Sequence, residues 1–189
     1  VWVGHFQAGL DYSLYQNGLF RTYAYLPQFN SANLSIRSFV NRGPEKVIGS
    51  RDGLFYINEA TGIVKSFVKP VLTSDLILTI CFYEGEYYIG TYGGGMMVLN
   101  PQTLSLKYFT QGDTELFQKG HIFCVKPDNR GNLWIGTSQG LFCYNGQTKQ
   151  IKNFTSTNSQ LPEGNVYEVS FDSTGKGWIA TETGMCIYD

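Results

Sequence analysis

The side chains that could carry out catalysis or bind a metal are few in this chain, and they do not cluster in the sequence. Neither histidine, His5 or His121, has a cysteine or carboxylate at a spacing typical of a zinc site. No phosphate-binding loop, nucleophile elbow or zinc-protease motif occurs. Folding could bring scattered carboxylates together, but no pair stands out as a general acid and base. We therefore expect no metal, no cofactor and no enzymatic activity in this segment.

The histidines and cysteines have simpler structural interpretations. His121 occupies a strand-start position that Ser35, Leu76 and Asn165 fill elsewhere, so we interpret it as a tolerated residue and not a catalytic one. The cysteines lie in apolar strand segments, where buried free thiols are favoured over disulfides. A disulfide stays open as the alternative, so the cysteines leave the cellular compartment undecided. They are Cys81, Cys124, Cys143 and Cys186.

A sequence motif that recurs five times predicts the strands that must position any functional side chain. The copies read VWVGHFQAGL, KVIGSRDGLF, YYIGTYGGGM, LWIGTSQGLF and GWIATETGMC. A period of this length is typical of the blades of a β-propeller. Each copy contains a small anchor residue, and the anchors follow one another at intervals of 41 to 46 residues: Gly4, Gly49, Gly90, Gly136 and Ala180.

The unit from His121 to Phe154 shows how one repeat is built. HIFCVKP has apolar residues at Ile122, Phe123 and Val125 and is interpreted as a strand, and NLWIGT, LFCYN and IKNFT are the next strand-like stretches. The turn DNRG, from Asp128 to Gly131, joins the first two, and SQG and GQTKQ are the later turns. Four strands joined by short turns form one antiparallel blade.

The chain is therefore predicted to be all-β, a β-propeller segment of about four and a half four-stranded antiparallel blades. A seven-bladed ring at this period needs about 300 residues, so we expect a partial or open propeller whose end blades self-associate or meet further blades of the parent chain. Residue 1 already lies inside a repeat, which indicates a segment of a longer protein. The expected single propeller segment covers 1–189, with approximate blades at 1–25, 34–68, 76–110, 121–155 and 165–189.

Blade packing explains the residues that repeat. The anchor must be small because neighbouring sheets approach closely there. The aromatic residue two positions before most anchors is expected to fill the space between sheets, and we assign it to the core and not to a ligand site. These aromatic residues are Trp2, Tyr88, Trp134 and Trp178, and Val47 takes the place in the second copy.

The stretches DNRGNLWIGTSQGLFCYN at 128–145 and DSTGKGWIATETGMCIYD at 172–189 closely resemble the two-component regulator propeller repeat. The resemblance extends over the whole chain, with mild departures in the first three copies. That family is known mainly from extracytoplasmic sensor regions of bacterial hybrid two-component systems, ahead of a membrane helix and a histidine kinase. The resemblance implies a periplasmic segment that senses an oligosaccharide and signals to a kinase outside this chain.

The turns between second and third strands differ in chemistry although the scaffold around them repeats, as expected of a binding surface on rigid strands. Exposed turns also vary for lack of constraint, which is the alternative. The set is His5, Phe6, Gln7, Arg51, Asp52, Tyr92, Ser138, Gln139, Glu182 and Thr183. Phe6 and Tyr92 are candidates to stack on a sugar, and Arg51 favours an anionic glycan. The predicted ligand-binding residues are Phe6, Gln7, Arg51, Asp52, Tyr92, Gln139 and Glu182.

The longest connection, from Gln111 to Gly120, is predicted to form a flap over the same face. A net charge of −1 gives no electrostatic footprint for nucleic acid or for an anionic membrane surface. The longest apolar stretch, within LILTICFYEG, is too short to span a bilayer, so a membrane is expected only through the parent protein.

Two other function classes stay open. One is a protein-interaction propeller without a small ligand. The other, less favoured, is a glycan-active enzyme, because the turns DNRGNLW and DSTGKGW resemble the Asp-box hairpins of sialidases. No cluster of arginines is apparent that would hold a carboxylated sugar, which argues against that second class.

Overall fold

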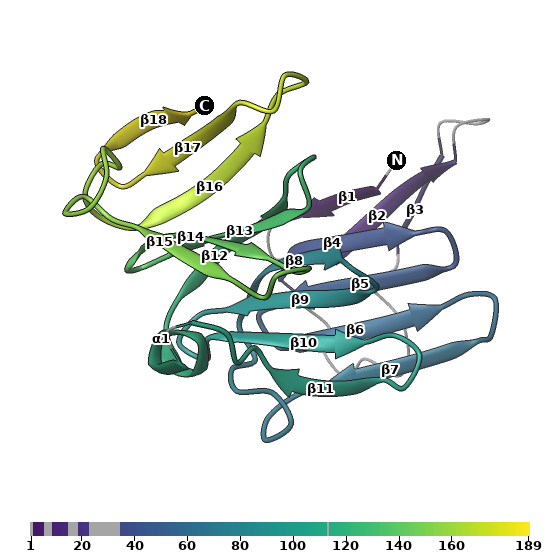
Figure 1. Ribbon diagram of the computed structural model, residues 1–189. Coiled ribbons are helices and arrows are strands. Elements are labelled where there is room, and N and C mark those ends of the chain that lie inside the picture. The colour runs from purple at the N-terminus through teal and green to yellow at the C-terminus, as the bar shows by residue number, and fades with distance from the viewer. Residues whose placement is uncertain (1, 6–8, 15–18, 23–34, 113) are drawn as a thin grey trace. The chain divides into compact units, whose positions relative to one another are not determined.

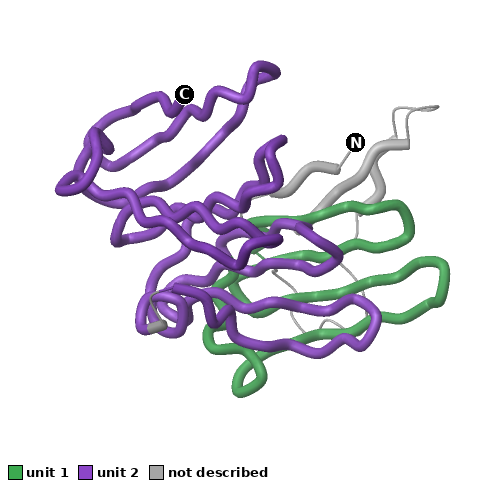
Figure 2. Tube along the Cα trace, viewed as in Figure 1, with its two compact units in different colours: residues 1–77 green, residues 78–189 purple. Residues whose placement is uncertain are grey.

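The computed structural model describes residues 2–5, 9–14, 19–22, 35–112 and 114–189 (Figure 1). For the three short N-terminal stretches it describes the backbone alone. Phe6 and Gln7, two of the predicted ligand-binding residues, lie outside the described residues. By its contacts the chain divides into two compact units, residues 1–77 and residues 78–189 (Figure 2), and each is described by itself below.

The first unit contains two antiparallel sheets whose strands pair in chain order. The first sheet has three strands, β1 (Trp2–His5), β2 (Gly9–Leu14) and β3 (Leu19–Thr22). The second has four, β4 (Ile36–Arg42), β5 (Glu45–Ser50), β6 (Gly53–Asn58) and β7 (Ile63–Phe67).

The second unit contains three sheets of the same kind and one short helix, α1 (Thr114–Lys119). The third sheet has β8 (Ile77–Tyr83), which starts at the last residue of the first unit, β9 (Glu86–Thr91), β10 (Met96–Asn100) and β11 (Ser105–Tyr108). The fourth has β12 (Ile122–Pro127), β13 (Asn132–Thr137), β14 (Gly140–Asn145) and β15 (Ile151–Phe154). The fifth has β16 (Val166–Phe171), β17 (Gly177–Thr181) and β18 (Gly184–Tyr188). The predicted all-β fold of four-stranded antiparallel blades is confirmed.

The aspartate turns are held by the carboxylate that opens them. Asp128 Oδ1 accepts the backbone N–H groups of Arg130 and Asn132, each at 2.8 Å, and Oδ2 accepts the indole N–H of Trp134 at 2.9 Å. Gly131 completes the turn with a φ of +80°, a left-handed conformation that favours glycine. Burial by itself would raise the pKa of Asp128, but hydrogen bonds from Asn132 and Trp134 outweigh it and lower that pKa. The carboxylate therefore fixes the turn and the core tryptophan together.

The anchor glycines lie where the next sheet comes closest. A Cβ placed on Gly136 would sit 2.7 Å from the carbonyl oxygen of Val166 in β16, and 2.6 Å from Cys124 Sγ. A Cβ on Gly90 would sit 2.7 Å from Cγ2 of Ile122 in β12. These distances are shorter than carbon atoms tolerate without a shift of the neighbour. The close approach of sheets explains why the repeat keeps a small residue here.

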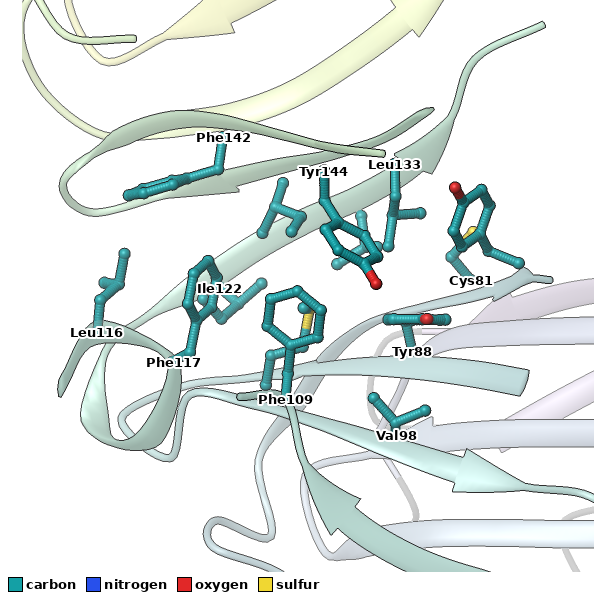
Figure 3. Packing of buried hydrophobic residues seen from close by; sticks show 14 residues of the cluster. Cys81, Tyr88, Val98, Phe109, Leu116, Phe117, Ile122, Leu133, Phe142 and Tyr144 are labelled. Atoms are coloured by element: carbon teal, nitrogen blue, oxygen red, sulfur yellow. The ribbon is translucent and has the colours of Figure 1, made fainter. Parts of the chain in front are cut away.

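Two clusters of buried side chains join the three sheets of the second unit. The first lies between the third and fourth sheets and is rich in aromatic rings, with Phe109 4.9 Å from Phe117 and 5.1 Å from Tyr144 between ring centroids (Figure 3). The second surrounds Trp134, which stacks on Phe154 at 5.8 Å. Trp134 and Tyr88 are 2 % and 6 % exposed, so their assignment to the core agrees with the structure. The same assignment is wrong for Trp178, which is 39 % exposed because it lies on an exposed face of the fifth sheet.

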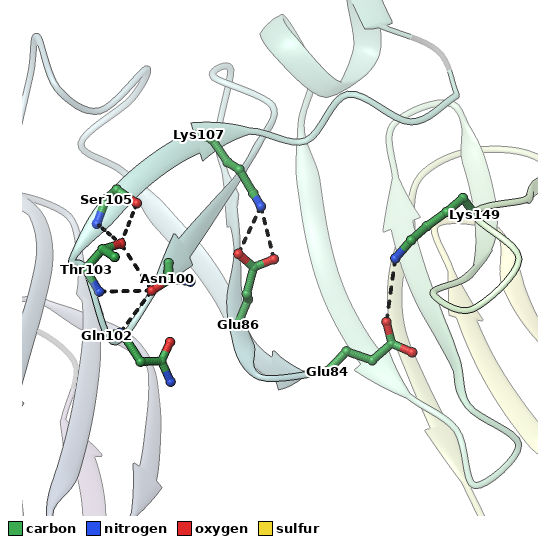
Figure 4. A network of polar contacts seen from close by, with 8 residues as sticks. All are labelled: Glu84, Glu86, Asn100, Gln102, Thr103, Ser105, Lys107 and Lys149. Carbon is green, nitrogen blue, oxygen red and sulfur yellow. Dashed lines mark hydrogen bonds and ion pairs between the residues drawn. The ribbon is translucent and has the colours of Figure 1, made fainter.

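Polar contacts also cross the third sheet and reach the fourth. Lys107 in β11 forms an ion pair with the carboxylate of Glu86 in β9 of the same sheet, at 2.9 Å (Figure 4). Glu84, in the turn between β8 and β9, lies 3.9 Å from Lys149 in the fourth sheet. Exposed pairs of this kind contribute little stability. Packing in the aromatic cluster is therefore the main interaction that holds the third and fourth sheets together.

The predicted flap at Gln111 to Gly120 is wrong. The connection contains α1, and its side chains Leu116 and Phe117 are 1 % and 0 % exposed. The backbone carbonyl of Gly120 accepts the N–H of Gly95 at 2.9 Å, which ties the segment to the turn after β9. Burial of two large apolar side chains anchors a segment more firmly than a flap allows.

The four cysteines are free thiols in the structure. Cys81 and Cys124 are buried, as predicted, whereas Cys143 and Cys186 are partly exposed. Within the described part of the chain, no helix is long and apolar enough to cross a membrane.

Candidate ligand-binding surface

A recurring backbone hydrogen bond joins the variable turns to the strand-start positions. The turn residues Arg51, Ser138 and Glu182 donate their N–H groups to the carbonyls of Ser35, His121 and Asn165, at 3.0, 3.2 and 2.9 Å. The turn after the second strand and the residue before the first strand therefore lie side by side in the second, fourth and fifth sheets. The sequence indicated both positions separately, and the structure brings them together.

The first strand of each of these sheets carries a β-bulge two residues after the strand-start position. The pairing passes from Ile122 to Cys124 along β12 and from Val166 to Glu168 along β16, so Phe123 and Tyr167 have no partner in the second strand. The same shift occurs at Arg37 in β4 of the first unit. Bulges redirect a side chain out of the regular alternation of a strand and are frequent next to functional sites.

These turns and bulges assemble a row of aromatic rings in the second unit. Tyr92, in the turn after β9, stacks on His121 with ring centroids 4.0 Å apart and an angle of 30° between the planes. His121 lies 6.1 Å from Phe123, whose ring meets that of Tyr167 edge to face at 5.1 Å. The outer members, Tyr92 and Tyr167, are 50 % and 43 % exposed. We call these four residues the aromatic row.

The ring of His121 has an unpaired nitrogen. Its Nδ1 is buried and has no hydrogen-bond partner among the described residues. An unpaired buried polar atom costs about 1 to 3 kcal/mol, and most buried polar groups in proteins are paired. Because this nitrogen is buried, it is not open to a ligand in the structure.

Polar groups gather at the Tyr167 end of the aromatic row. The side-chain amide of Asn165 donates to the hydroxyl of Tyr167 and to Oε2 of Glu182, both at 3.1 Å. Because the Tyr167 hydroxyl accepts this bond, its own proton is directed elsewhere. The backbone N–H of Asn165 also donates to Glu182 Oε2, at 3.3 Å. A hydroxyl donor and a carboxylate acceptor thus lie together on the exposed side of the strand.

The predicted ligand-binding residues are not all brought together. Tyr92 belongs to the aromatic row, and Glu182 lies at its polar end. Gln139 is exposed and lines a separate pocket of about 260 Å³ with Ser138 and Glu163. Arg51 and Asp52 lie in the first unit, in the turn after β5, where the Asp52 N–H donates to Ser50 Oγ at 2.9 Å.

Four residues at this surface are not among the residues predicted from the sequence: His121, Phe123, Tyr167 and Asn165. A signal for them was present in the repeat. The strand-start position holds Ser35, Leu76, His121 and Asn165, and the position two residues later holds Arg37, Leu78, Phe123 and Tyr167. Both positions vary as widely as the turns do.

The polar and aromatic groups of this surface are suited to hydrogen bonding and ring stacking. No group of three or more histidine, cysteine, aspartate or glutamate side chains capable of holding a metal occurs among the residues that the structure describes. Stacked rings, a phenol proton and a carboxylate oxygen are instead the groups that recognise a ligand with hydroxyl groups and an apolar face.

Comparisons with known proteins agree with this architecture. The sequence profile of the family described as two component regulator propeller matches residues 117–139, which run from the end of α1 through β13. No curated protein sequence matches the chain.

Solved structures match over the whole chain. The extracellular domain of the putative hybrid two component system BT3049 from B. thetaiotaomicron is 28 % identical with a TM-score of 0.73, and the chain covers 25 % of it. The corresponding domain of BT4673 from B. thetaiotaomicron is 19 % identical with a TM-score of 0.71, and the chain covers 30 % of it. The structure of YCF48 bound to D1 peptide is 12 % identical with a TM-score of 0.68. The two extracellular domains match this chain over its whole length, and the chain spans about a quarter to a third of the length of each.

The family profile matches inside one of the five repeats, and the fold match to the BT3049 extracellular domain extends over the whole chain. This chain is a β-propeller segment in which residues 117–139 match the two component regulator propeller family.

Proposed function

We propose that this chain is part of the extracytoplasmic, periplasmic sensor region of a hybrid two-component system. In this proposal the propeller binds an oligosaccharide and passes the signal to a histidine kinase elsewhere in the parent protein. The family profile supports the class of protein, and the 28 % identity over the whole chain with the BT3049 extracellular domain supports the location. The observation that carries the binding function is the exposed aromatic row with its polar end.

The segment binds without catalysing a reaction in this proposal. A glycosidase needs two carboxyl groups on either side of the bond it cleaves. The carboxylate at the aromatic row, Glu182, instead accepts hydrogen bonds from the backbone and side chain of Asn165 through a single oxygen. Such an arrangement suits recognition of a ligand hydroxyl.

The experiment is a binding screen with a built-in test for turnover. The chain is incubated with a glycan library, and melting temperature and reducing ends are followed together. A bound glycan raises the melting temperature in a concentration-dependent, saturating manner, and no new reducing ends appear. The absence of any glycan-dependent shift would contradict ligand sensing, and release of reducing ends would show an enzyme.

A second candidate, an interaction surface for another blade or another copy of the chain, is favoured by one face of the fifth sheet. Trp178 pairs with Ile187 and Ala180 pairs with Met185, so these side chains share that face. Trp178, Ile187 and Met185 are 39 %, 47 % and 66 % exposed. Light scattering over a range of concentrations tests this candidate: association that Met185→Lys weakens supports it, and a strict monomer contradicts self-association.

A further inference from the structure

We infer that the aromatic row selects an uncharged sugar and discriminates against anionic glycans. This inference rests on the proposed sensing function and deepens it by naming the class of ligand. It differs from the sequence-based preference for an anionic glycan, which depended on Arg51. Three features of the second unit support it: the exposure of the rings, the direction of the polar groups and the sign of the charge.

The exposure of the rings indicates a ligand and not packing alone. Rings that serve only the core of this unit are almost fully covered, as for Phe109 and Phe142 at 4 % and 3 % exposed. Tyr92 and Tyr167 keep about half of their surface free although each touches another ring of the row. The C–H faces of a pyranose ring are apolar and cover an aromatic face well, because they remove both surfaces from water.

The polar groups match hydroxyls, which donate and accept at the same atom. The Tyr167 hydroxyl accepts from Asn165 and so presents its proton as a donor. Glu182 uses Oε2 for Asn165, and its second oxygen has no partner among the described residues. A sugar hydroxyl satisfies such donors and acceptors without carrying a charge.

The charge at the aromatic row is negative. Glu182 lies at its end, and the Oε2 atom of this carboxylate is 3.1 Å from the side-chain amide of Asn165. Lys126, on the same strand as Phe123, forms an ion pair with Glu168 at 3.1 Å. A sulfate or uronate at this surface would face carboxylates and compete with an existing ion pair for its cation.

The experiment compares neutral and anionic glycans on the full chain and on three variants. The probes are a glycan array with neutral and with sulfated or uronic-acid glycans, and titration calorimetry of the best binder of each kind. Tyr167→Phe keeps the ring but removes the hydroxyl, and Glu182→Gln keeps the acceptor but removes the charge. Tyr108→Phe is the matched control, since Tyr108 is 47 % exposed and outside the aromatic row.

The expected result is that neutral glycans bind more tightly than anionic ones. Tyr167→Phe should lower the affinity for the neutral glycan by about three- to tenfold, in line with the loss of one hydrogen bond. Tyr108→Phe should leave this affinity unchanged. Glu182→Gln should reduce the difference in affinity between neutral and anionic glycans. Tighter binding of an anionic glycan, or neutral binding that Tyr167→Phe leaves unchanged, would overturn this inference while ligand sensing stands. Failure of every glycan to bind the parent chain would contradict both.

Discussion

The hydroxyl of Tyr83 in the third sheet donates to the backbone carbonyl of Gly131 in the fourth sheet at 2.7 Å. The same oxygen accepts the N–H of Gly146 at 2.9 Å. The Tyr83 side chain therefore connects the third sheet to two turns of the fourth sheet, the turn between β12 and β13 and the turn between β14 and β15. Together with the aromatic cluster around Phe109, this bond makes the sheets of the second unit a firm support for the aromatic row.

Removing that hydroxyl should weaken the second unit. Tyr83→Phe keeps the ring in its contact with Tyr88 but leaves the buried N–H of Gly146 without a partner. The expected loss in free energy of unfolding is about 1 to 2 kcal/mol, measured by urea denaturation. Tyr108→Phe, at an exposed ring, serves as control and should change nothing measurable. Equal stability of the two variants would show that the bond between sheets is not made.

The anchor glycine should tolerate no added carbon. In Gly136→Ala the new methyl group would meet the Val166 carbonyl at 2.7 Å, and a backbone atom cannot rotate away. We expect a loss of about 1 to 3 kcal/mol, typical of overpacking. Ser66→Ala, on an exposed position of β7, is the control and should stay within about 0.5 kcal/mol of the parent chain. A stable Gly136→Ala protein would contradict the close approach of the fourth and fifth sheets.

The fold was predictable from the sequence because short-range features define the repeat. The turn at Asp128 and Gly131, the apolar residues of β12 and the small residue at Gly136 are such features, and similar features recur in the other repeats. Helix α1 was not predictable in this way. Its six residues are too few to show helical periodicity, and the burial of Leu116 and Phe117 depends on sheets distant in sequence.

The site was predictable only in part, for a physical reason. Tyr92 and Glu182 could be selected because they depart from the repeat inside a turn. Phe123 and Tyr167 lie within strands, and a strand pattern predicts simple alternation there. The bulge that redirects them is a shift in pairing between two strands, so it leaves no mark on the spacing along one strand.

The aspartate turn of the fifth sheet should make stability depend on acid pH. The Thr174 hydroxyl, with backbone N–H groups, lowers the pKa of Asp172 from 3.8 to about 2. A carboxylate whose pKa is lower in the folded state contributes stability above its unfolded pKa and loses it as pH falls. Free energies of unfolding should therefore drop between about pH 4 and pH 2, and less so in Asp172→Asn.

A second variant separates the turn from general acid effects. Thr174→Val removes the hydroxyl that binds Asp172 at 2.6 Å and should flatten the same part of the pH profile. Identical profiles for the parent chain and both variants would exclude this turn as the source of the acid dependence.

The cysteines should react in an order set by burial. Burial raises the pKa of Cys124 to about 12 and that of Cys81 to about 11, so both stay as unreactive thiols near neutral pH. Cys186 is partly exposed and should be alkylated first when the folded chain is treated at about pH 8. Mass spectrometry of the labelled peptides gives the order, and all four should react alike in urea. Early labelling of Cys124 would contradict the packing between the fourth and fifth sheets.

The most direct test of the central claim is calorimetric titration of the best neutral glycan into the parent chain, Tyr92→Ala and Tyr108→Ala. Both tyrosines are about half exposed, at 50 % and 47 %, but only Tyr92 stacks on His121 in the aromatic row. We predict that Tyr92→Ala weakens binding about tenfold, the effect of losing one stacked ring, whereas Tyr108→Ala binds as the parent chain does. Unchanged binding by Tyr92→Ala, or equal losses in both variants, would contradict the claim that the aromatic row is the ligand-binding surface.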